Sequence, residues 1–453
     1  MDVRGKAIRI DLFSLATPQM RAFHMAWLAF FSVFFAWFGI APLMPVIRED
    51  LGLTQAQIGN TMIASVAATV LVRVLIGPLC DRFGARLTYS VLLIIGSIPV
   101  MTVGLARSYE SFLLFRLAIG CIGAAFVVTQ YHTSTMFAPN CVGTANATTA
   151  GWGNLGGGFT QMLMPVVLAG FLLLGASEAA AWRYAMVVPG VVLLLMGVAY
   201  YLFTQDSPQG NYSDMRRAGA LPSTAKTSSF ASFKSAASDP RVWALFVVYA
   251  ACFGMELTIN NVAALYFHDR FSLDVKTAGL VAGLFGMMNL FARTLGGFSS
   301  DWIAKRSGMF GRSRLLFALI LAEGLALVLF SRMNVLGLAI AAMLLFSLFV
   351  QMASGATFGI VPFVNRSNLG AVAGIVGAGG NVGAVLAGFL FRAEGVPYQQ
   401  IFLFLGVSVI MASGAMLAVK FVPSSAAAHA KAGSVSDGLP RAARTSGSLA
   451  EMA

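Results

Sequence analysis

The chain has 453 residues, of which 58% are hydrophobic and only 11% are charged, whereas soluble domains are about 25% charged. This composition excludes a water-soluble globular protein, a disordered chain and a secreted disulfide scaffold. The net charge of +12 does not indicate nucleic-acid binding, because the basic residues do not cluster but are spread over short loops, as the positive-inside rule describes. The bilayer is therefore the expected solvent, and continuous apolar runs predict membrane helices rather than a barrel.

Charged residues divide the chain into apolar runs of about 20 residues or more, the length that spans a membrane. The residues before the first run lack the short apolar stretch and cleavage site of a signal peptide, so we expect that run to stay in the mature protein. The longest uncharged stretch is divided at Ala138-Pro139-Asn140, which has turn chemistry. We predict an all-α membrane protein with twelve transmembrane helices, over residues 25–46, 56–79, 87–106, 111–135, 142–174, 184–204, 242–267, 278–300, 315–331, 335–360, 369–391 and 399–420.

The distribution of Lys and Arg orients these helices. With the N-terminus inside, 20 of the 30 basic residues fall on the inner side, among them Arg366 in the tenth loop; 7 fall outside and 3 within the membrane. We therefore expect a multi-pass protein of the cell inner (plasma) membrane with both termini cytoplasmic. The expected parts are an N-terminal arm (1–24), a six-helix half (25–204), a cytoplasmic linker (205–241), a second six-helix half (242–420) and a flexible tail (421–453).

Two stretches about 220 residues apart resemble each other. Residues 73–86 read RVLIGPLCDRFGAR and residues 293–306 read RTLGGFSSDWIAKR, so Arg, Leu, Gly, Asp and Arg coincide without a gap. A second echo pairs GNLG at 153–156 with GNVG at 380–383. Such a repeat predicts two pseudo-symmetric halves in parallel orientation that share a site near the middle of the membrane, which is a transporter plan.

Arg73 and Arg293 each lie eight residues before an Asp that marks a helix end, which places them about 12 Å into an apolar core about 30 Å thick. A guanidinium at that depth costs several kcal/mol unless it meets water, a counter-charge or a ligand, and the reach is long for snorkelling. We expect the pair to create a positive cavity whose content is an anion. The planar fork of arginine suits a flat oxyanion, and nitrate and nitrite are flat and singly charged.

Two predicted helices, the fifth and the eleventh, carry glycine clusters with an asparagine in the middle. Glycine allows helices to approach closely, and packing alone explains most of these positions. It does not explain Asn154 and Asn381, which we expect to hydrogen-bond the oxyanion; the alternative is that they lock neighbouring helices together. The glycines of the two clusters are Gly151, Gly153, Gly156, Gly157, Gly377, Gly379, Gly380 and Gly383.

These motifs resemble those of the major facilitator superfamily and, more narrowly, of the nitrate–nitrite porter family. The superfamily's loop motif, Gly-x3-Asp-Arg-x-Gly-x-Arg, stands at 77–86, and the family's two nitrate signatures resemble 150–158 and 374–383. Further matches stand at 41–48 and 134–137, and 253–261 is similar to the branch with plant and fungal high-affinity nitrate transporters. The resemblance covers about residues 22–420. The second signature runs Gly-Ala-Gly-Gly-Asn rather than repeating the first, so the halves are not expected to be equivalent at the substrate.

The resemblance implies a major facilitator fold and transport of nitrate, often also of nitrite, by alternating access. Its substrate-binding arginines and asparagines map onto Arg73, Arg293, Asn154 and Asn381. A role in gating or in the loop motif is expected for a second set of residues. These are Gly77, Asp81, Arg82, Arg86, Asp301, Arg306 and Arg116, the last in preference to direct ligation.

The family contains proton–nitrate symporters and nitrate/nitrite exchangers. Symport needs a titrating group on the permeation route, and Glu256 is the main candidate; it is equally compatible with a hydrogen-bonded partner of an arginine or a neighbouring helix. His132 is a weaker candidate for a proton relay. Proton-coupled uptake is favoured over exchange, transport of another small oxyanion, and a non-transporting sensor. We expect no enzymatic activity, metal or cofactor, and no nucleic-acid partner; nitrate, nitrite, protons and the lipid bilayer are the expected partners.

Overall fold

The computed structural model describes the chain except for residues 3–4, 139, 220–228, 366–368 and 420–453. Pro139, Arg366, the middle of the linker and the tail from 421 onward therefore lie outside the described residues. Every regular element in the described part is a helix. The first half of the chain forms α1 (Pro18–Trp37), η1 (Ala41–Leu43), α2 (Met44–Leu51), α3 (Gln55–Phe83), α4 (Ala85–Thr102), η2 (Val103–Leu105), α5 (Tyr109–Gly120), η3 (Cys121–Ala124), α6 (Ala125–Met136), α7 (Val142–Leu173), α8 (Glu178–Ala185) and α9 (Val187–Phe203).

Two short helices of the linker separate this half from the next. They are α10 (Tyr212–Arg217) and α11 (Ser229–Ala237). The second half forms α12 (Pro240–Phe271), α13 (Val275–Met287), η4 (Met288–Leu290), α14 (Ala292–Ser331), α15 (Leu336–Phe358), η5 (Val361–Phe363), α16 (Leu369–Phe391), α17 (Tyr398–Ser413) and η7 (Gly414–Ala418).

A helix stands at each of the twelve positions expected from the sequence. By length and apolar composition, ten helices of the described chain qualify as membrane spans, or eleven if the two bent segments of α3 count as one span. One of the ten, Val275–Ser331, is 57 residues long and covers both 278–300 and 315–331; within it Gly308 has a non-helical φ of 57°. The protein is therefore a polytopic helical membrane protein. The break between α6 and α7, from Met136 to Val142, falls where turn chemistry predicted it.

The helices that carry the two intramembrane arginines both depart from a straight α-helix near the arginine, α3 by a bend and α14 by a break at its start. In α3 the segments Gln55–Arg73 and Leu75–Phe83 meet at an angle of 45°. In the second half, the 3-10 turn Met288–Leu290 and the non-helical Phe291 separate α13 from α14 two residues before Arg293. Interrupted membrane helices expose main-chain polar groups at the middle of the membrane, so Arg293 lies where the backbone can take part in a polar site, whereas Arg73 lies beside a bend in a continuous helix.

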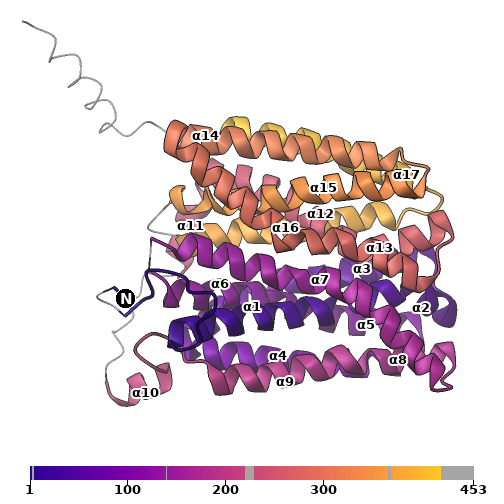
Figure 1. Ribbon diagram of the computed structural model, residues 1–453, viewed down its shortest axis with the longest axis horizontal. Coiled ribbons are helices and arrows are strands. Elements are labelled where there is room, and N and C mark those ends of the chain that lie inside the picture. Colours follow the sequence, from indigo (N-terminus) through magenta and orange to yellow (C-terminus); the bar gives the residue numbers. More distant parts are fainter. Residues whose placement is uncertain (3–4, 139, 220–228, 366–368, 420–453) are drawn as a thin grey trace, which may run out of the picture. The chain divides into compact units, whose positions relative to one another are not determined.

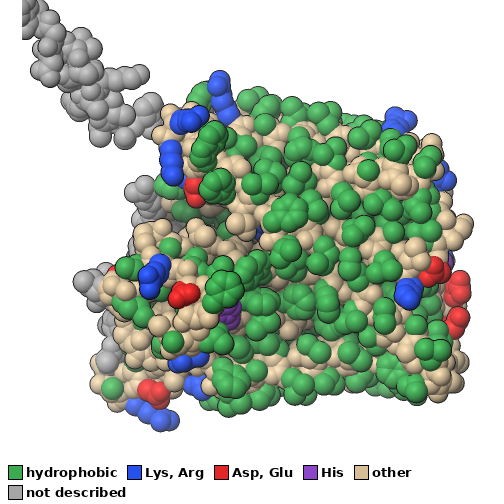
Figure 2. Space-filling view, in the orientation of Figure 1, with side chains coloured by type: hydrophobic (Ala, Val, Ile, Leu, Met, Phe, Trp, Pro, Cys, Tyr) green, Lys and Arg blue, Asp and Glu red, His purple; other side chains and the backbone are tan. Residues whose placement is uncertain are grey.

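Within residues 1–419, the helices of each half pack mainly against one another, and α3 with α16 and α7 with α13 make the closest contacts between the halves. Figure 1 shows the two sets of helices one above the other. One end of the bundle carries the N-terminus, α10 and α11; we call it the linker end, and the end with α2 and α8 the opposite end. Figure 2 shows an apolar band along the helices, with Lys and Arg gathered mostly at the linker end.

Candidate anion-binding site

Arg73 lies in the interface between the halves. Its guanidinium is 9% exposed, and Nη1 donates to the carbonyl oxygen of Gly377 on α16 at 2.8 Å. Nη2 lies 3.5 Å from the carbonyl oxygen of Gly123, in the 3-10 turn η3 that interrupts the fourth span. Nε has no partner, and in the described part of the chain no carboxylate forms an ion pair with Arg73. Within the described chain its hydrogen bonds therefore go to main-chain carbonyls, not to a carboxylate.

Arg293 is 2% exposed and differs from Arg73 because it has an acidic partner. Nη1 lies 3.4 Å from Oε2 of Glu256, and Nη2 donates to the hydroxyl of Tyr249 at 3.2 Å. The other oxygen of Glu256 accepts hydrogen bonds from Asn154 at 3.0 Å and from Asn289 at 2.9 Å. The two arginines and this one carboxylate leave a formal charge of +1, which is the charge that one monovalent anion balances.

Aromatic rings separate the two guanidinium groups. Arg73 lies over the ring of Phe126 at 5.2 Å and Arg293 over the ring of Phe253 at 5.7 Å, both within cation–π distance. Phe253 stacks on Tyr249 with ring centroids 5.1 Å apart and lies 6.3 Å from Phe126. Aromatic rings therefore contact both guanidinium groups and link them through Phe126 and Phe253.

Sequence reasoning did not identify Phe126, Tyr249, Phe253 or Asn289 as site residues. Tyr249, Phe253 and Glu256 are spaced at i, i+4 and i+7 on α12, so they share one helix face, and that spacing is the signal that could have found them. Asn289 lies in the 3-10 turn just before Arg293, and no sequence pattern indicated that turn.

The two signature asparagines lie at the site but differ in their contacts. Asn154 is 1% exposed and donates to Glu256, so it reaches Arg293 through that carboxylate. Asn381 is fully buried, and its Nδ2 lies 3.5 Å from the Gly377 carbonyl that also accepts from Arg73. The side-chain oxygen of each has no partner. Their roles toward a substrate remain a prediction, and the bond of Asn154 to Glu256 joins α7 to α12, as the alternative of helix locking expects.

The signature glycines fall into two groups. A Cβ on Gly153 would overlap the ring of Phe30, one on Gly156 the carbonyl of Phe31, and one on Gly379 or Gly383 the backbone of α12; Gly380 faces Phe253, and Gly157 faces Asn260 at 3.1–3.3 Å. Gly151 and Gly377 differ, because an added Cβ would meet only ordinary contacts. Those contacts include the arginines: a Cβ at Gly151 would lie 3.4 Å from the Asn289 carbonyl oxygen and 3.5 Å from Cδ of Arg293, and one at Gly377 would lie 3.7 Å from Nη1 of Arg73. Close packing thus explains most of the cluster, and these two positions leave room beside the site.

The opposite end of the bundle is closed by polar contacts between the halves. Arg48 and Asp269 form a two-pronged ion pair at 2.8 and 2.9 Å, and Tyr398 donates to the same carboxylate at 3.3 Å. Gln55 donates to the carbonyl of Ala393 at 3.1 Å. The structure is therefore in a state whose opposite end is shut.

His132 lies at the linker end of α6 and both of its ring nitrogens are occupied. Nε2 lies 2.7 Å from the carbonyl oxygen of Gln205, which can only accept, so Nε2 carries the proton. Nδ1 then accepts from the hydroxyl of Tyr200 at 2.5 Å. These contacts join α6 to the end of α9, away from the arginine pair, and they favour a structural role over a proton relay.

The loop-motif residues lie at the linker end rather than at the site. Gly84 begins α4 with a φ of 86°, and a Cβ there would overlap the carboxyl of Asp206. Asp206 accepts from the backbone N–H of Arg86 at 2.8 Å and of Tyr212 at 2.9 Å, while Nε of Arg86 donates to the Tyr201 carbonyl. Burial raises the pKa of Asp206 above its ordinary 3.8. The motif thus anchors the linker on the first half.

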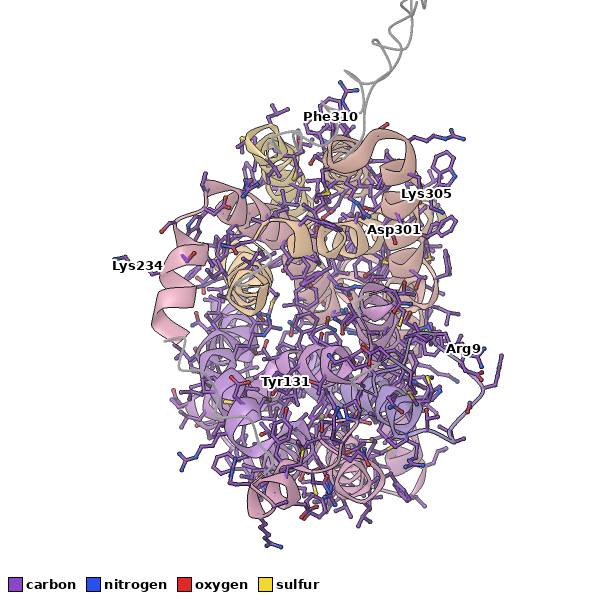
Figure 3. The ribbon with its side chains drawn as sticks, turned by 90° about the vertical axis from the view of Figure 1, so that its left-hand side faces the viewer. Arg9, Tyr131, Lys234, Asp301, Lys305 and Phe310 are labelled. Atoms are coloured by element: carbon purple, nitrogen blue, oxygen red, sulfur yellow. The ribbon has the colours of Figure 1, made fainter. Side chains whose placement is uncertain are left out.

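Arg82, Asp301 and Arg306 of the expected gating set also lie at this end, whereas Arg116 is buried between the halves, where it contacts Asn261. Arg82 accepts at its carbonyl from Arg216 of α10. In the second half Asp301 pairs with Arg312 at 2.7 Å, whereas Arg306 lies over the Trp302 ring at 4.7 Å. Figure 3, which looks onto the linker end, shows Asp301 and Lys305 on the second half, with Tyr131 on the first. Within the described chain, no three His, Cys, Asp or Glu side chains lie together as a metal site requires.

This architecture is that of a membrane transporter with a charged site between two sets of helices. The family model of the Major Facilitator Superfamily matches residues 26–310. The fold is similar to the xylose transporter XylE from E. coli, with a TM-score of 0.67 and 15% identity over 89% of this chain and 98% of that one. It is equally similar to a bacterial homologue of the lysosomal transporter Spinster, with a TM-score of 0.67 and 17% identity over 91% and 100% of the chains.

Relatives with similar sequences identify the family within this superfamily. The chain is 43% identical to "High affinity nitrate transporter 2.5" of Arabidopsis thaliana over 86% of this chain and 77% of that protein. It is 42% identical to "High-affinity nitrate transporter 2.3" of Oryza sativa subsp. japonica over 87% and 76%. It is 32% identical to the nitrate/nitrite transporter NrtP of Picosynechococcus over 81% and 84%. The chain belongs to the nitrate–nitrite porter family of the Major Facilitator Superfamily, which confirms the resemblance and makes it a transporter rather than an enzyme.

Proposed function

We propose that the protein carries nitrate, and also nitrite, across the membrane by alternating access, with Arg73 and Arg293 as the groups that bind the anion. The observation that carries the proposal is the formal charge of +1 that Arg73, Arg293 and Glu256 leave together, since Arg73 has no carboxylate partner among the described residues. A planar oxyanion matches the flat forks and the aromatic walls. The printed names of the relatives, nitrate and nitrate/nitrite transporters, support the same substrates.

The contacts between the halves suggest how binding is linked to movement. Arg73 of the first half contacts Gly377 of the second, and Arg293 of the second half lies against Gly151 of the first. An anion held by both arginines therefore adds an attraction between the halves that is absent when the site is empty. A ligand shifts a conformational equilibrium only by its differential affinity for the two states, and the bridging geometry supplies that difference.

We further propose that the linker end faces the cytoplasm and that the membrane is the plasma (inner) membrane. The concentration of Lys and Arg at the linker end supports this orientation. The ion pair of Arg48 with Asp269 would then close the outer side, and the described state would be one that releases substrate inward. The division into two six-helix halves at 25–204 and 242–420, joined by the linker 205–241, is part of the same proposal.

Glu256 supplies a route to proton coupling. When it is ionised it neutralises Arg293; when it takes up a proton, Arg293 loses its counter-charge and the formal charge of the site rises from +1 to +2. A proton on Glu256 thus strengthens anion binding, and by linkage a bound anion strengthens proton binding to the same extent. This reciprocity favours proton-coupled uptake over nitrate/nitrite exchange, which requires no titrating group.

Reconstitution of the full chain into liposomes tests the proposal. Nitrate uptake driven by an inward proton gradient alone is expected, with competition by nitrite stronger than by chlorate or formate. A strict need for nitrite inside the vesicles would identify an exchanger instead. Nitrate binding without any uptake would identify a sensor, and uptake inhibited most strongly by formate or chlorate would identify a transporter of another small oxyanion.

A further inference from the structure

A third arginine is buried between the halves on the outer side of the central site. Arg116 lies on α5 and is 1% exposed. Nη2 donates to the side-chain oxygen of Asn261 on α12, in the other half, at 2.8 Å. Nε and Nη1 have no partner, and in the described part of the chain no carboxylate forms an ion pair with Arg116.

This arrangement is costly unless something else compensates it. A guanidinium inside the membrane costs several kcal/mol when it lacks a counter-charge or water, and each buried donor without an acceptor adds to the cost. If Arg116 only held the two helices together (a structural strut), a neutral side chain opposite Asn261 would be enough. The positive charge, with two unused donor nitrogens, instead points to an anion.

The position along α12 places this group between the central site and the outer closure. Asn261 lies five residues from Glu256, about 7.5 Å along the helix, and eight residues from Asp269, about 12 Å in the opposite direction. Arg116 lies on α5, seven residues before Gly123, and the carbonyl of Gly123 faces Arg73. An anion that enters past the ion pair of Arg48 and Asp269 therefore meets Arg116 before it reaches Arg73.

We propose that Arg116, oriented by Asn261, forms a second anion-binding site that a small monovalent oxyanion occupies on its way to the central site. The proposal rests on the proposed function, because it takes the same ligand class and assigns the outer side of the protein as the side of entry. The structure shows the state in which the outer end is shut, and in that state Nη2 is held by the Asn261 amide.

The test compares Arg116→Gln, Arg116→Lys and Asn261→Asp in the full chain. Arg116→Gln removes the charge, Arg116→Lys keeps it, and Asn261→Asp places a built-in carboxylate against the guanidinium. The KM for nitrate added outside is measured in proteoliposomes. The Kd of the tightest nitrate site, which the proposed function assigns to the two central arginines, is measured by calorimetry on the purified protein. We expect Arg116→Gln and Asn261→Asp to raise the KM about tenfold and Arg116→Lys at most about threefold, with every Kd within about twofold of wild type.

The strut interpretation predicts a different pattern, because Asn261→Asp would turn the hydrogen bond into an ion pair and leave the KM unchanged. An unchanged KM in Asn261→Asp, equal KM values for the Gln and Lys variants, or a parallel rise of KM and Kd would each overturn the second site. Since Asn261→Asp keeps a partner for Arg116, it tests the site even if Arg116→Gln fails to fold. If wild type neither binds nor moves nitrate, the proposed function fails; if only the variant pattern fails, the central site stands without the second one.

Discussion

Arg73 on α3 donates to the carbonyl of Gly377 on α16 at 2.8 Å, so the first arginine is held by the glycine-rich helix of the other half. The second arginine repeats this relationship in reverse, because Arg293 lies against Gly151 on the glycine-rich helix of the first half. The symmetry ends at the charge: Glu256 pairs with Arg293, and no acid of the described chain pairs with Arg73. Arg73 is therefore free to bind the anion at all times, whereas Arg293 becomes free to bind it when a proton on Glu256 removes its counter-charge.

Replacing either arginine of the central site by lysine tests the need for a planar fork. Lysine keeps the charge but cannot donate two parallel hydrogen bonds or lie flat over Phe126 or Phe253. We expect Arg73→Lys and Arg293→Lys each to lower kcat/KM for nitrate uptake by about 100-fold or more. Arg86→Lys is the control, since Arg86 lies at the linker end, and it should have a mild effect. Equal, mild losses in all three variants would refute the binding-site assignment.

Glu256→Gln tests the coupling mechanism. Glutamine keeps an oxygen that can accept from Asn154 and Asn289 but cannot take up or release a proton. We expect the variant to lose accumulation driven by a proton gradient while nitrate/nitrate counterflow continues. Proton-driven accumulation at the wild-type level would show that the proton uses another route.

Alanine substitutions at two glycines of α7 distinguish the effect of close helix packing on stability from the effect of intrinsic helix propensity. Alanine normally stabilises a helix by about 1 kcal/mol relative to glycine, and Gly170→Ala should show that gain because no atom lies within 4 Å of its Cβ position. Gly156→Ala should instead lose about 1–3 kcal/mol, since its Cβ would overlap the carbonyl of Phe31. Thermal unfolding of the purified variants measures both. A stabilised Gly156→Ala protein would contradict the close approach of α1 and α7.

The linker anchor at Asp206 predicts a pH dependence of stability. Burial raises the pKa of this carboxyl above 3.8, so the folded protein binds the proton more tightly than the unfolded chain does. The contribution of Asp206 to stability is therefore present below pH 3.8 and is lost as the pH rises through the folded-state pKa. The thermal midpoint of wild type relative to Asp206→Asn should fall as the pH rises through this window. A relative midpoint that rises with pH would contradict the burial of the carboxyl.

The sequence predicted the features that occur in both halves of the chain and the turns that end its helices. The repeat singled out Arg73 and Arg293, which are both buried, and turn chemistry located the break between α6 and α7. Helix faces were harder to predict, because helices that are apolar on all sides carry no periodic signal. For that reason Phe126 was missed, although it lies against Arg73. Tyr249 was also missed, although its spacing from Glu256 on α12 could have indicated it. The pairing of Glu256 with Arg293 also depends on how α12 meets α14 in space, so the sequence left its two interpretations open.

Equilibrium binding of nitrate to the purified protein tests the central claim most directly. Titration of wild type, Arg73→Lys, Arg293→Lys and Arg86→Lys by calorimetry separates the binding of the ion from every later step of transport. We predict that wild type and Arg86→Lys bind nitrate with similar affinity and that both central-site variants bind it at least about 30-fold more weakly. Wild-type affinity in Arg73→Lys and Arg293→Lys would mean that the anion is bound elsewhere in the protein.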